Sequence, residues 1–301
     1  MNRLLPLLLL LAECAAARPA LAALDRATLV GLGASVLRIE APTVQGGFSL
    51  GSGVVVGDDT VVTNCHVTRD ATEVRIVQGA LRWVAATQAS DVSRDLCLLR
   101  VPGLKAPAVP WGRADGLAAG QAVTAIGYTG GTGIQSSSGE VVRLHRHDGA
   151  PVIQSDNWFS SGASGGGLFD DQGRLVGILT FRLRGGLSHY FAAPSEWVQK
   201  MMDATATDRF RPVRPMEPGL LAYWELPQKQ QPRFMQAASL LRDRRWAELL
   251  AMATDWSRAE PDDDEPWSLL GVALEHLGRL PEAQHAYDCS KRPVSRNCTH
   301  P

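Results

Sequence analysis

Gly162-Ala163-Ser164-Gly165-Gly166-Gly167 is followed at once by LFDDQGRLVGILTF (168–181), and these residues are the most informative about the fold. A glycine-rich loop can hold a phosphate when a helix begins at its end, because the helix N-terminus attracts anions. The residues after this loop instead predict a β-hairpin, with Asp170-Asp171-Gln172-Gly173 as its turn. The pattern therefore favours a serine in a tight loop between strands over a phosphate-binding loop.

Short segments rich in β-branched residues precede this stretch. They are ASVLRIE (34–40), GSGVVVG (51–57), TVVTN (60–64), EVRIV (73–77), LCLLRV (96–101) and AVTAIGY (122–128). Turn signals such as Gly57-Asp58-Asp59 and Pro102-Gly103 separate them. No long helical period interrupts residues 34–193, so antiparallel barrels or a sandwich are expected rather than an α/β fold.

The character of the sequence changes beyond residue 205. Residues 206–231 carry several prolines and predict a linker, whereas apolar residues recur at helical spacing within 232–301. A tetratricopeptide pattern is matched by Trp267, Leu270, Gly271, Gly278, Ala283 and Tyr287, with a weaker copy upstream in which Ala247 corresponds to Ala283. A generic helical hairpin that covers the rest of the protein is the alternative, because about three repeats are needed for a stable array.

Residues 1–22, MNRLLPLLLLLAECAAARPALA, predict a signal peptide that is cleaved on export. Arg3 precedes an apolar run, and Ala20-Leu21-Ala22 fits the cleavage pattern of small residues. The run is too short to span a membrane. A lipid-modified Cys14 is the alternative, but Glu13 stands where such signals have a small residue. We therefore expect a soluble product, in the periplasm or secreted, with no membrane attachment after cleavage.

Composition excludes other classes of function. The chain has 301 residues, with 30 basic and 31 acidic side chains, and 45% of its residues are hydrophobic. This material suffices for a large core, and the even charge gives no sign of a nucleic-acid partner. The cysteines show no C-x-x-C spacing, and no histidine lies at zinc spacing from them. No metal or other cofactor is expected.

Two further segments combine with the serine loop to predict nucleophilic catalysis. Thr63-Asn64-Cys65-His66-Val67 follows a predicted strand, and Arg94-Asp95-Leu96 begins another. Each alone is weak, because a lone histidine is most often a surface residue and an aspartate before a strand most often a turn. Together, His66 can act as base for the Ser164 hydroxyl, and Asp95 can orient the imidazole. The glycines let backbone N–H groups converge on an oxyanion.

Six ordered segments resemble the trypsin-like serine peptidases, in particular their bacterial HtrA-like (Deg-like) branch. They are GSGVVV (51–56), TNCHV (63–67), RDLCLLRV (94–101), QSDNWFSSGASGGGLFD (154–170), GRLVGILTF (173–181) and YFAAPS (190–195). The resemblance implies an all-β double β-barrel peptidase domain over residues 23–205, with its site between the barrels. It also implies a serine endopeptidase that forms an acyl-enzyme with protein or peptide substrates. The tetratricopeptide-like helices stand where this branch usually carries a PDZ domain.

Carried over position by position, the resemblance makes His66 the general base, Asp95 its orienting partner and Ser164 the nucleophile. The oxyanion hole would be formed by the backbone N–H groups of Gly162 and Ser164. Ala163 stands where the digestive branch has an aspartate that pairs with a newly cut N-terminus, so that activation route is absent.

The resemblance also outlines the substrate site. Thr180 falls where the family places a hydroxyl near the triad carboxylate, and Phe181 and Arg182 would flank the substrate backbone at the strand edge. The pocket walls would come from 156–161, 180–182 and 189–192, and are largely apolar through Trp158, Phe159, Phe181 and Tyr190. We expect cleavage after uncharged, small to medium apolar residues. An inward-facing His189 would instead favour an acidic residue, although an exposed loop histidine is the simpler interpretation.

The resemblance places the Asp95 carboxylate against the backbone around the histidine, so Cys65 and Cys97 should lie side by side. In an oxidising compartment we expect them to form a disulfide, with two buried free thiols as the alternative. Cys289 at the end of the last helix and Cys298 in the tail predict a second disulfide that pins the C-terminus.

Two other functions stay open. The chain can be a non-catalytic module that docks a protein partner through its helices, or an enzyme whose site is gated by substrate. All three triad residues are present, which favours catalysis.

Overall fold

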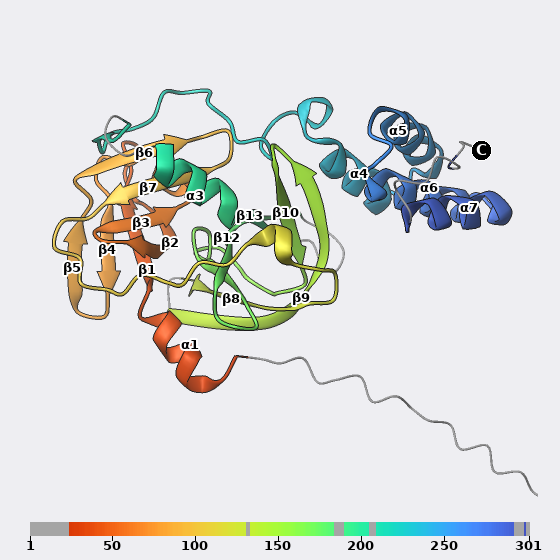
Figure 1. The fold of residues 1–301 in the computed structure, drawn as a ribbon. Helices are drawn as coiled ribbons and strands as arrows, with labels where there is room; N and C mark the ends of the chain where they lie inside the picture. Colours follow the sequence, from red (N-terminus) through yellow and green to blue (C-terminus); the bar gives the residue numbers. More distant parts are fainter. Residues whose placement is uncertain (1–23, 131–132, 184–189, 205–208, 292–297, 299–301) are drawn as a thin grey trace, which may run out of the picture.

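A computed structural model describes residues 24–130, 133–183, 190–204, 209–291 and 298 (Figure 1). Two β-structures follow each other along the chain, and a group of helices lies beside the second. The predicted signal peptide and His189 lie outside the described residues. Among the helices described, none combines the length and the apolar character that crossing a membrane requires.

The first β-structure is an open antiparallel sheet in the order β14-β6-β7-β3-β2-β1-β4-β5. Its strands are β1 (Val36–Pro42), β2 (Phe48–Gly57), β3 (Thr60–Thr63), β4 (Arg75–Gln78), β5 (Leu81–Val84), β6 (Thr87–Asp91), β7 (Leu96–Arg100) and β14 (Arg211–Pro212). Leu37, Ile76 and Leu99 are among the fully buried side chains of its core. The expected segments are therefore strands, but the described residues do not close this sheet into a barrel.

The second β-structure is a closed antiparallel barrel in the order β10-β13-β12-β11-β8-β9. Its strands are β8 (Ala122–Thr129), β9 (Gly133–His147), β10 (Ala150–Ser155), β11 (Gly167–Asp170), β12 (Leu175–Arg182) and β13 (Tyr190–Pro194). The hairpin predicted after the serine loop forms β11 and β12, and Gly173 supplies a left-handed φ of 73° in its turn. The expected all-β double-barrel architecture is thus present as a closed six-stranded barrel beside a half-barrel formed by the open sheet.

Helices mark the ends and the connections. They are α1 (Arg26–Gly33), α2 (Cys65–Thr68), the 3₁₀ turn η1 (Ala114–Gly116), α3 (Ser195–Ala204), the 3₁₀ turn η2 (Gln228–Gln230), α4 (Arg233–Arg242), α5 (Trp246–Ala259), α6 (Asp264–His276) and α7 (Leu280–Ser290). The carboxylate of Asp25 starts α1 by accepting the N–H groups of Ala27 and Thr28.

Helices α4 to α7 pack through the small residues that the sequence singled out. A Cβ at Gly271 on α6 would lie 2.5 Å from the Tyr287 ring on α7, so only glycine permits this approach. Gly278 ends α6 with a left-handed φ of 76°. Cys289 at the end of α7 and Cys298 form a disulfide with their Cα atoms 5.7 Å apart. A tetratricopeptide character of these helices stays a prediction.

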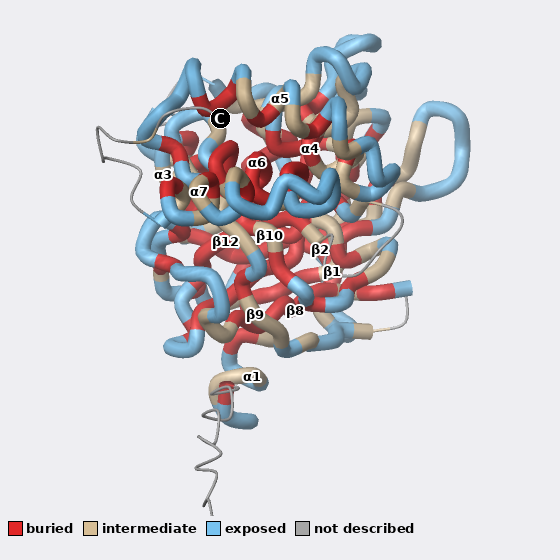
Figure 2. Tube along the Cα trace, turned by 90° about the vertical axis from the view of Figure 1, so that its right-hand side faces the viewer, coloured by how far each residue is buried: buried red, intermediate tan, exposed pale blue. Residues whose placement is uncertain are grey.

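The helices dock on the closed barrel, in front of β9 and β10 in Figure 2. The Nδ1 atom of His145 on β9 lies 2.8 Å from Oε1 of Glu265 on α6. The His145 ring also stacks on the ring of Phe234 on α4, with centroids 4.5 Å apart. Each side chain of the His145–Glu265 pair is only 5% exposed. The barrel and the helices therefore share a buried polar contact that only their correct docking satisfies.

The described part of the proline-rich segment, residues 209–231, makes contacts with the first sheet. β14 from this segment pairs with the edge strand β6, and the N–H of Tyr223 donates to Ser93 O at 3.0 Å. Glu225 forms a 2.6 Å ion pair with Arg69, and Tyr223 is buried. The segment is thus packed along the first sheet before it reaches the helices.

Glu265→Ala should lower the free energy of unfolding by roughly 3 kcal/mol, because it leaves His145 Nδ1 buried without its acceptor, while Nε2 keeps its contact with Gln154. Chemical denaturation measures this. Glu248→Ala, which removes a largely exposed carboxylate on α5, is the matched control and should change little. Equal effects of the two substitutions would show that the buried contact contributes nothing.

Candidate active site

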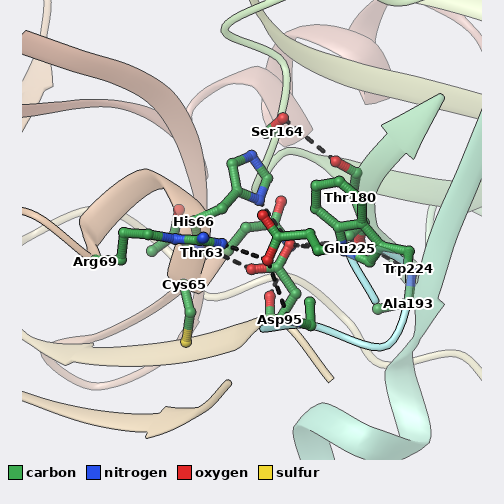
Figure 3. A network of polar contacts seen from close by, with 12 residues as sticks. Thr63, Cys65, His66, Arg69, Asp95, Ser164, Thr180, Ala193, Trp224 and Glu225 are labelled. Atoms are coloured by element: carbon green, nitrogen blue, oxygen red, sulfur yellow. Dashed lines mark hydrogen bonds and ion pairs between the residues drawn. The ribbon is translucent and has the colours of Figure 1, made fainter. Parts of the chain in front are cut away.

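His66 and Asp95 meet where the first sheet faces the barrel (Figure 3). His66 lies on α2 directly after β3, and Asp95 directly precedes β7, the neighbour of β3. Asp95 Oδ2 is 2.6 Å from His66 Nδ1, and Oδ1 accepts the His66 backbone N–H at 2.8 Å. Both oxygens therefore hold the histidine, and its ring lies between Asp95 and Ser164 in Figure 3.

The Asp95 backbone is held as firmly as its side chain. Asp95 is fully buried and has a φ of 58°, a left-handed conformation that is unfavourable for a residue with a Cβ. Its carbonyl accepts the Cys65 N–H at 3.3 Å and the Asn64 side-chain amide at 2.9 Å. These bonds retain the strained conformation, which aims the carboxylate at the histidine. No pattern in the sequence predicts this contact between Asn64 and the Asp95 backbone.

A disulfide joins the same two segments. Cys65 and Cys97 are fully buried, and their Cα atoms are 5.0 Å apart. Cys97 is paired in register with Thr63 of β3, two residues before Cys65. The pairing of β3 with β7 therefore brings the cysteines together, and the bridge fixes the histidine turn against the strand that carries the aspartate.

The Ser164 loop is bound by a residue of the first sheet. Ser52 on β2 donates its N–H to Ser164 O and its hydroxyl to Gly162 O, each at 2.7 Å. A Cβ at Gly165, where φ is 86°, would lie 2.1 Å from Ser52 O. Ser52 belongs to the GSGVVV segment. Its contacts with Gly162 and Ser164 cannot be predicted from the sequence, because a serine in a strand carries no pattern that indicates partners so far along the chain.

The N–H groups of Gly162 and Ser164 are available to a ligand. Gly130 N–H donates to Ser161 O at 2.9 Å, so the N–H on the other side of that trans peptide, from Gly162, points away from Gly130. Within the described part of the chain, neither Gly162 nor Ser164 donates its N–H to a protein acceptor. Two such donors on one loop are what an oxyanion hole requires.

The Ser164 hydroxyl is bonded to a backbone carbonyl. It donates to Thr180 O at 3.4 Å, and among the described residues it makes no hydrogen bond with the His66 ring. Catalytic hydrogen bonds are often long or misaligned before substrate binds, so this geometry is compatible with catalysis.

The Thr180 hydroxyl does not bond to the Asp95 carboxylate. It donates to Ile178 O at 2.8 Å and lies 3.3 Å from the Asn64 side-chain nitrogen. Asp95 Oδ2 instead accepts the indole N–H of Trp224 at 3.2 Å. Sequence reasoning missed Trp224 because it is 129 positions from Asp95, in a segment predicted to be a linker.

The predicted substrate strand and pocket walls lie near the serine loop. Arg182 on β12 pairs with Tyr190 on β13, and the Tyr190 ring lies 4.8 Å from that of Phe159. A cavity of about 20 Å³ lies beside the loop, with Trp158, Phe159, Ala163 and Leu179 among its lining residues. This cavity is small and largely apolar.

Asp95 and Tyr223 are both buried. Burial raises the pKa of the Tyr223 hydroxyl, and the negative charge of Asp95 raises that pKa further. Among the described residues, no cluster of His, Cys, Asp or Glu side chains is arranged to hold a metal ion.

Residues 51–178 match a family model described as a trypsin-like peptidase domain. A probable periplasmic serine endoprotease, DegP-like, of Marinomonas sp. (strain MWYL1) is 35% identical over 181 residues, which cover 56% of this chain and 38% of the relative. Serine protease HTRA4 of Mus musculus is 29% identical over 212 residues, covering 64% and 43%. The chain thus spans less than half the length of either relative.

Solved structures agree on the fold. The HtrA-type protease AlgW, determined with a tripeptide, has a TM-score of 0.54 at 28% identity, covering 59% of this chain and 62% of that one. A protease of M. tuberculosis in its active form has a TM-score of 0.58 at 23% identity, covering 65% and 93%, a likeness of fold alone.

Residues 51–178 are therefore similar to a trypsin-like peptidase domain. The two relatives, which match part of this chain, are named as serine proteases. The helices from α4 onward lie outside the residues that the family model matches.

Gly165→Ala should lower the free energy of unfolding by more than about 3 kcal/mol, because strained backbone and a clash with Ser52 O add together. Gly79→Ala is the matched control. Gly79 also has a left-handed φ, of 57°, but an added Cβ there meets nothing within 4 Å. Gly79→Ala should therefore lower the free energy of unfolding by only about 1 kcal/mol. Similar losses in denaturant titrations would mean that the Ser52 contact does not constrain the loop.

Proposed function

We propose that this protein is a serine endopeptidase that hydrolyses peptide bonds through His66, Asp95 and Ser164. The observation that carries the proposal is the 2.6 Å contact between Asp95 Oδ2 and His66 Nδ1. This contact leaves Nε2 as the ring nitrogen that can receive the Ser164 proton. A buried carboxylate in this position fixes the tautomer and stabilises the imidazolium that forms.

The reaction follows from these positions. His66 Nε2 takes the proton as Ser164 Oγ attacks the scissile carbonyl carbon, and the negative charge moves to the carbonyl oxygen. The N–H groups of Gly162 and Ser164 receive that charge. The imidazolium then gives its proton to the leaving amine as the C–N bond breaks, which leaves an acyl-enzyme. Water, deprotonated by His66, releases the acid and restores Ser164.

Substrate binding would use the end of β12 beyond Ile178, where β11 no longer pairs with this strand. Phe181 and Arg182 lie at the end of this strand, one and two residues beyond Thr180, whose carbonyl already accepts a hydrogen bond from Ser164. An extended peptide can pair with such an edge. The 20 Å³ cavity near Ala163 would take the side chain before the cleaved bond, which favours a small apolar residue.

A substrate-gated peptidase is the second candidate, and the position of the Ser164 hydroxyl favours it. Oγ donates to Thr180 O, an acceptor that a substrate N–H would compete for. Binding of a peptide along β12 would then release the hydroxyl toward His66. The rate of fluorophosphonate labelling, measured with and without a non-cleavable peptide, distinguishes a gated site from a constitutive one. Faster labelling in the presence of the peptide supports gating. Equal rates support a constitutive site.

We further propose export to the periplasm or beyond the cell, in keeping with relatives named as periplasmic. The helices α4 to α7 would serve as a tetratricopeptide-like contact for a protein partner. Neither nucleic acid nor a cofactor has a place in this proposal.

Ser164→Ala should reduce peptide hydrolysis by about 10⁴-fold or more, and Asp95→Asn by about 10⁴-fold in kcat. Ser290→Ala at the end of α7 is the matched control and should retain full activity. Unchanged hydrolysis by purified Ser164→Ala protein would end the proposal.

Profiling with a peptide library should show cleavage after uncharged, small to medium apolar residues, because the cavity is small and apolar. Trp158→Ala removes one wall of this cavity and should extend the preference to larger residues. Trp83→Ala, in the distant strand β5, is the control and should leave the profile unchanged. A strong preference for Lys or Arg would contradict this assignment.

A further inference from the structure

Trp224 lies outside both β-structures in sequence, yet its side chain lies in the active site (Figure 3). Its Nε1 is 3.2 Å from Asp95 Oδ2. Its ring stacks on Phe181 with centroids 5.1 Å apart and meets the His66 ring edge-on at 5.6 Å. One side chain thus contacts the carboxylate, the imidazole and the predicted substrate strand.

The residues around Trp224 are anchored on several sides. On its N-terminal side, the N–H of Tyr223 donates to the carbonyl of Ser93 at 3.0 Å, and Ser93 is two residues before Asp95 in the chain. After it, Glu225 pairs at 2.6 Å with Arg69, which directly follows the helix α2 that carries the histidine. The Trp224 carbonyl accepts the Gln231 side-chain amide at 2.9 Å. The position of the indole is therefore set by contacts to both catalytic segments.

The indole N–H of Trp224 is the second hydrogen-bond donor to Asp95 Oδ2, whose other side-chain donor is His66. Asp95 Oδ2 accepts from His66 Nδ1, and a buried carboxylate oxygen needs further donors to remain charged at low cost. The Thr180 hydroxyl donates elsewhere, to Ile178 O. The Tyr223 hydroxyl is buried and makes no hydrogen bond among the described residues. Trp224 is thus the second side-chain donor to this oxygen.

We propose that Trp224 is a positioning residue of this active site. Its N–H fixes the Asp95 carboxylate in the plane that His66 Nδ1 requires, and its ring limits the movement of the imidazole between Asp95 and Ser164. The segment that follows the peptidase domain therefore completes the catalytic machinery. This inference rests on the proposed function of the triad.

Trp224→Phe in the full-length protein keeps an aromatic ring for stacking on Phe181 and removes only the N–H donor. We expect kcat to fall about tenfold, equivalent to about 1.4 kcal/mol, with KM within about twofold. The proton NMR signal of His66 Nδ1–H should shift, because its acceptor oxygen has lost a second donor. Trp83→Phe is the matched control, since it removes an N–H that donates to Gly103 O far from the site.

Glu225→Ala provides a second variant in case Trp224→Phe fails to fold. It releases the anchor to Arg69 without changing the indole, and it should lower kcat and shift the same signal in the same direction. Equal kcat and an unshifted Nδ1–H signal in Trp224→Phe and Trp83→Phe would overturn the proposal. A rise in kcat would overturn it too, because the indole would then be an obstruction. If the unaltered protein hydrolyses no peptide, the proposed function fails, whereas the NMR comparison still tests the Trp224 contact.

Discussion

The buried carboxylate of Asp95 accepts three hydrogen bonds, from the backbone and ring of His66 and from the indole of Trp224. Its backbone carbonyl accepts two more, from the turn that carries the histidine. A left-handed conformation at a residue with a Cβ persists only where the surroundings impose it. The arrangement of the site therefore depends on this one residue, which the Cys65–Cys97 bridge and the pairing of β3 with β7 hold in place.

A second set of contacts joins the two β-structures around the nucleophile. Ser52 reaches from the open sheet to the Ser164 loop, and its hydroxyl also accepts the Tyr128 N–H from the barrel at 2.8 Å. Gly165 allows the loop to pass close to Ser52 O. The open sheet thus supplies His66 and Asp95, the barrel supplies the Ser164 loop, and the buried Ser52 joins the two.

The sequence predicted the features that depend on local pattern. The hairpin of β11 and β12 follows from alternating apolar residues around a turn, and the residues of the triad segments lie at the junction of the two β-structures. Contacts between distant segments could not be predicted in this way. Neither Ser52 nor Trp224 belongs to a pattern that names its partner, and prolines in 206–231 suggested a linker where β14 pairs with β6. The Thr180 hydroxyl bonds to the Ile178 carbonyl instead of the carboxylate, a local choice that residue type alone does not determine.

The most direct test of this account is labelling of the full-length protein with a fluorophosphonate, followed by mass mapping of the adduct. This reagent reacts with a serine whose hydroxyl is activated by a neighbouring base and whose oxyanion is stabilised. The account predicts a single adduct, on Ser164, whose formation is greatly slowed in Asp95→Asn. The absence of any adduct on Ser164 under conditions in which the protein is folded, or an adduct on a different serine, would contradict it.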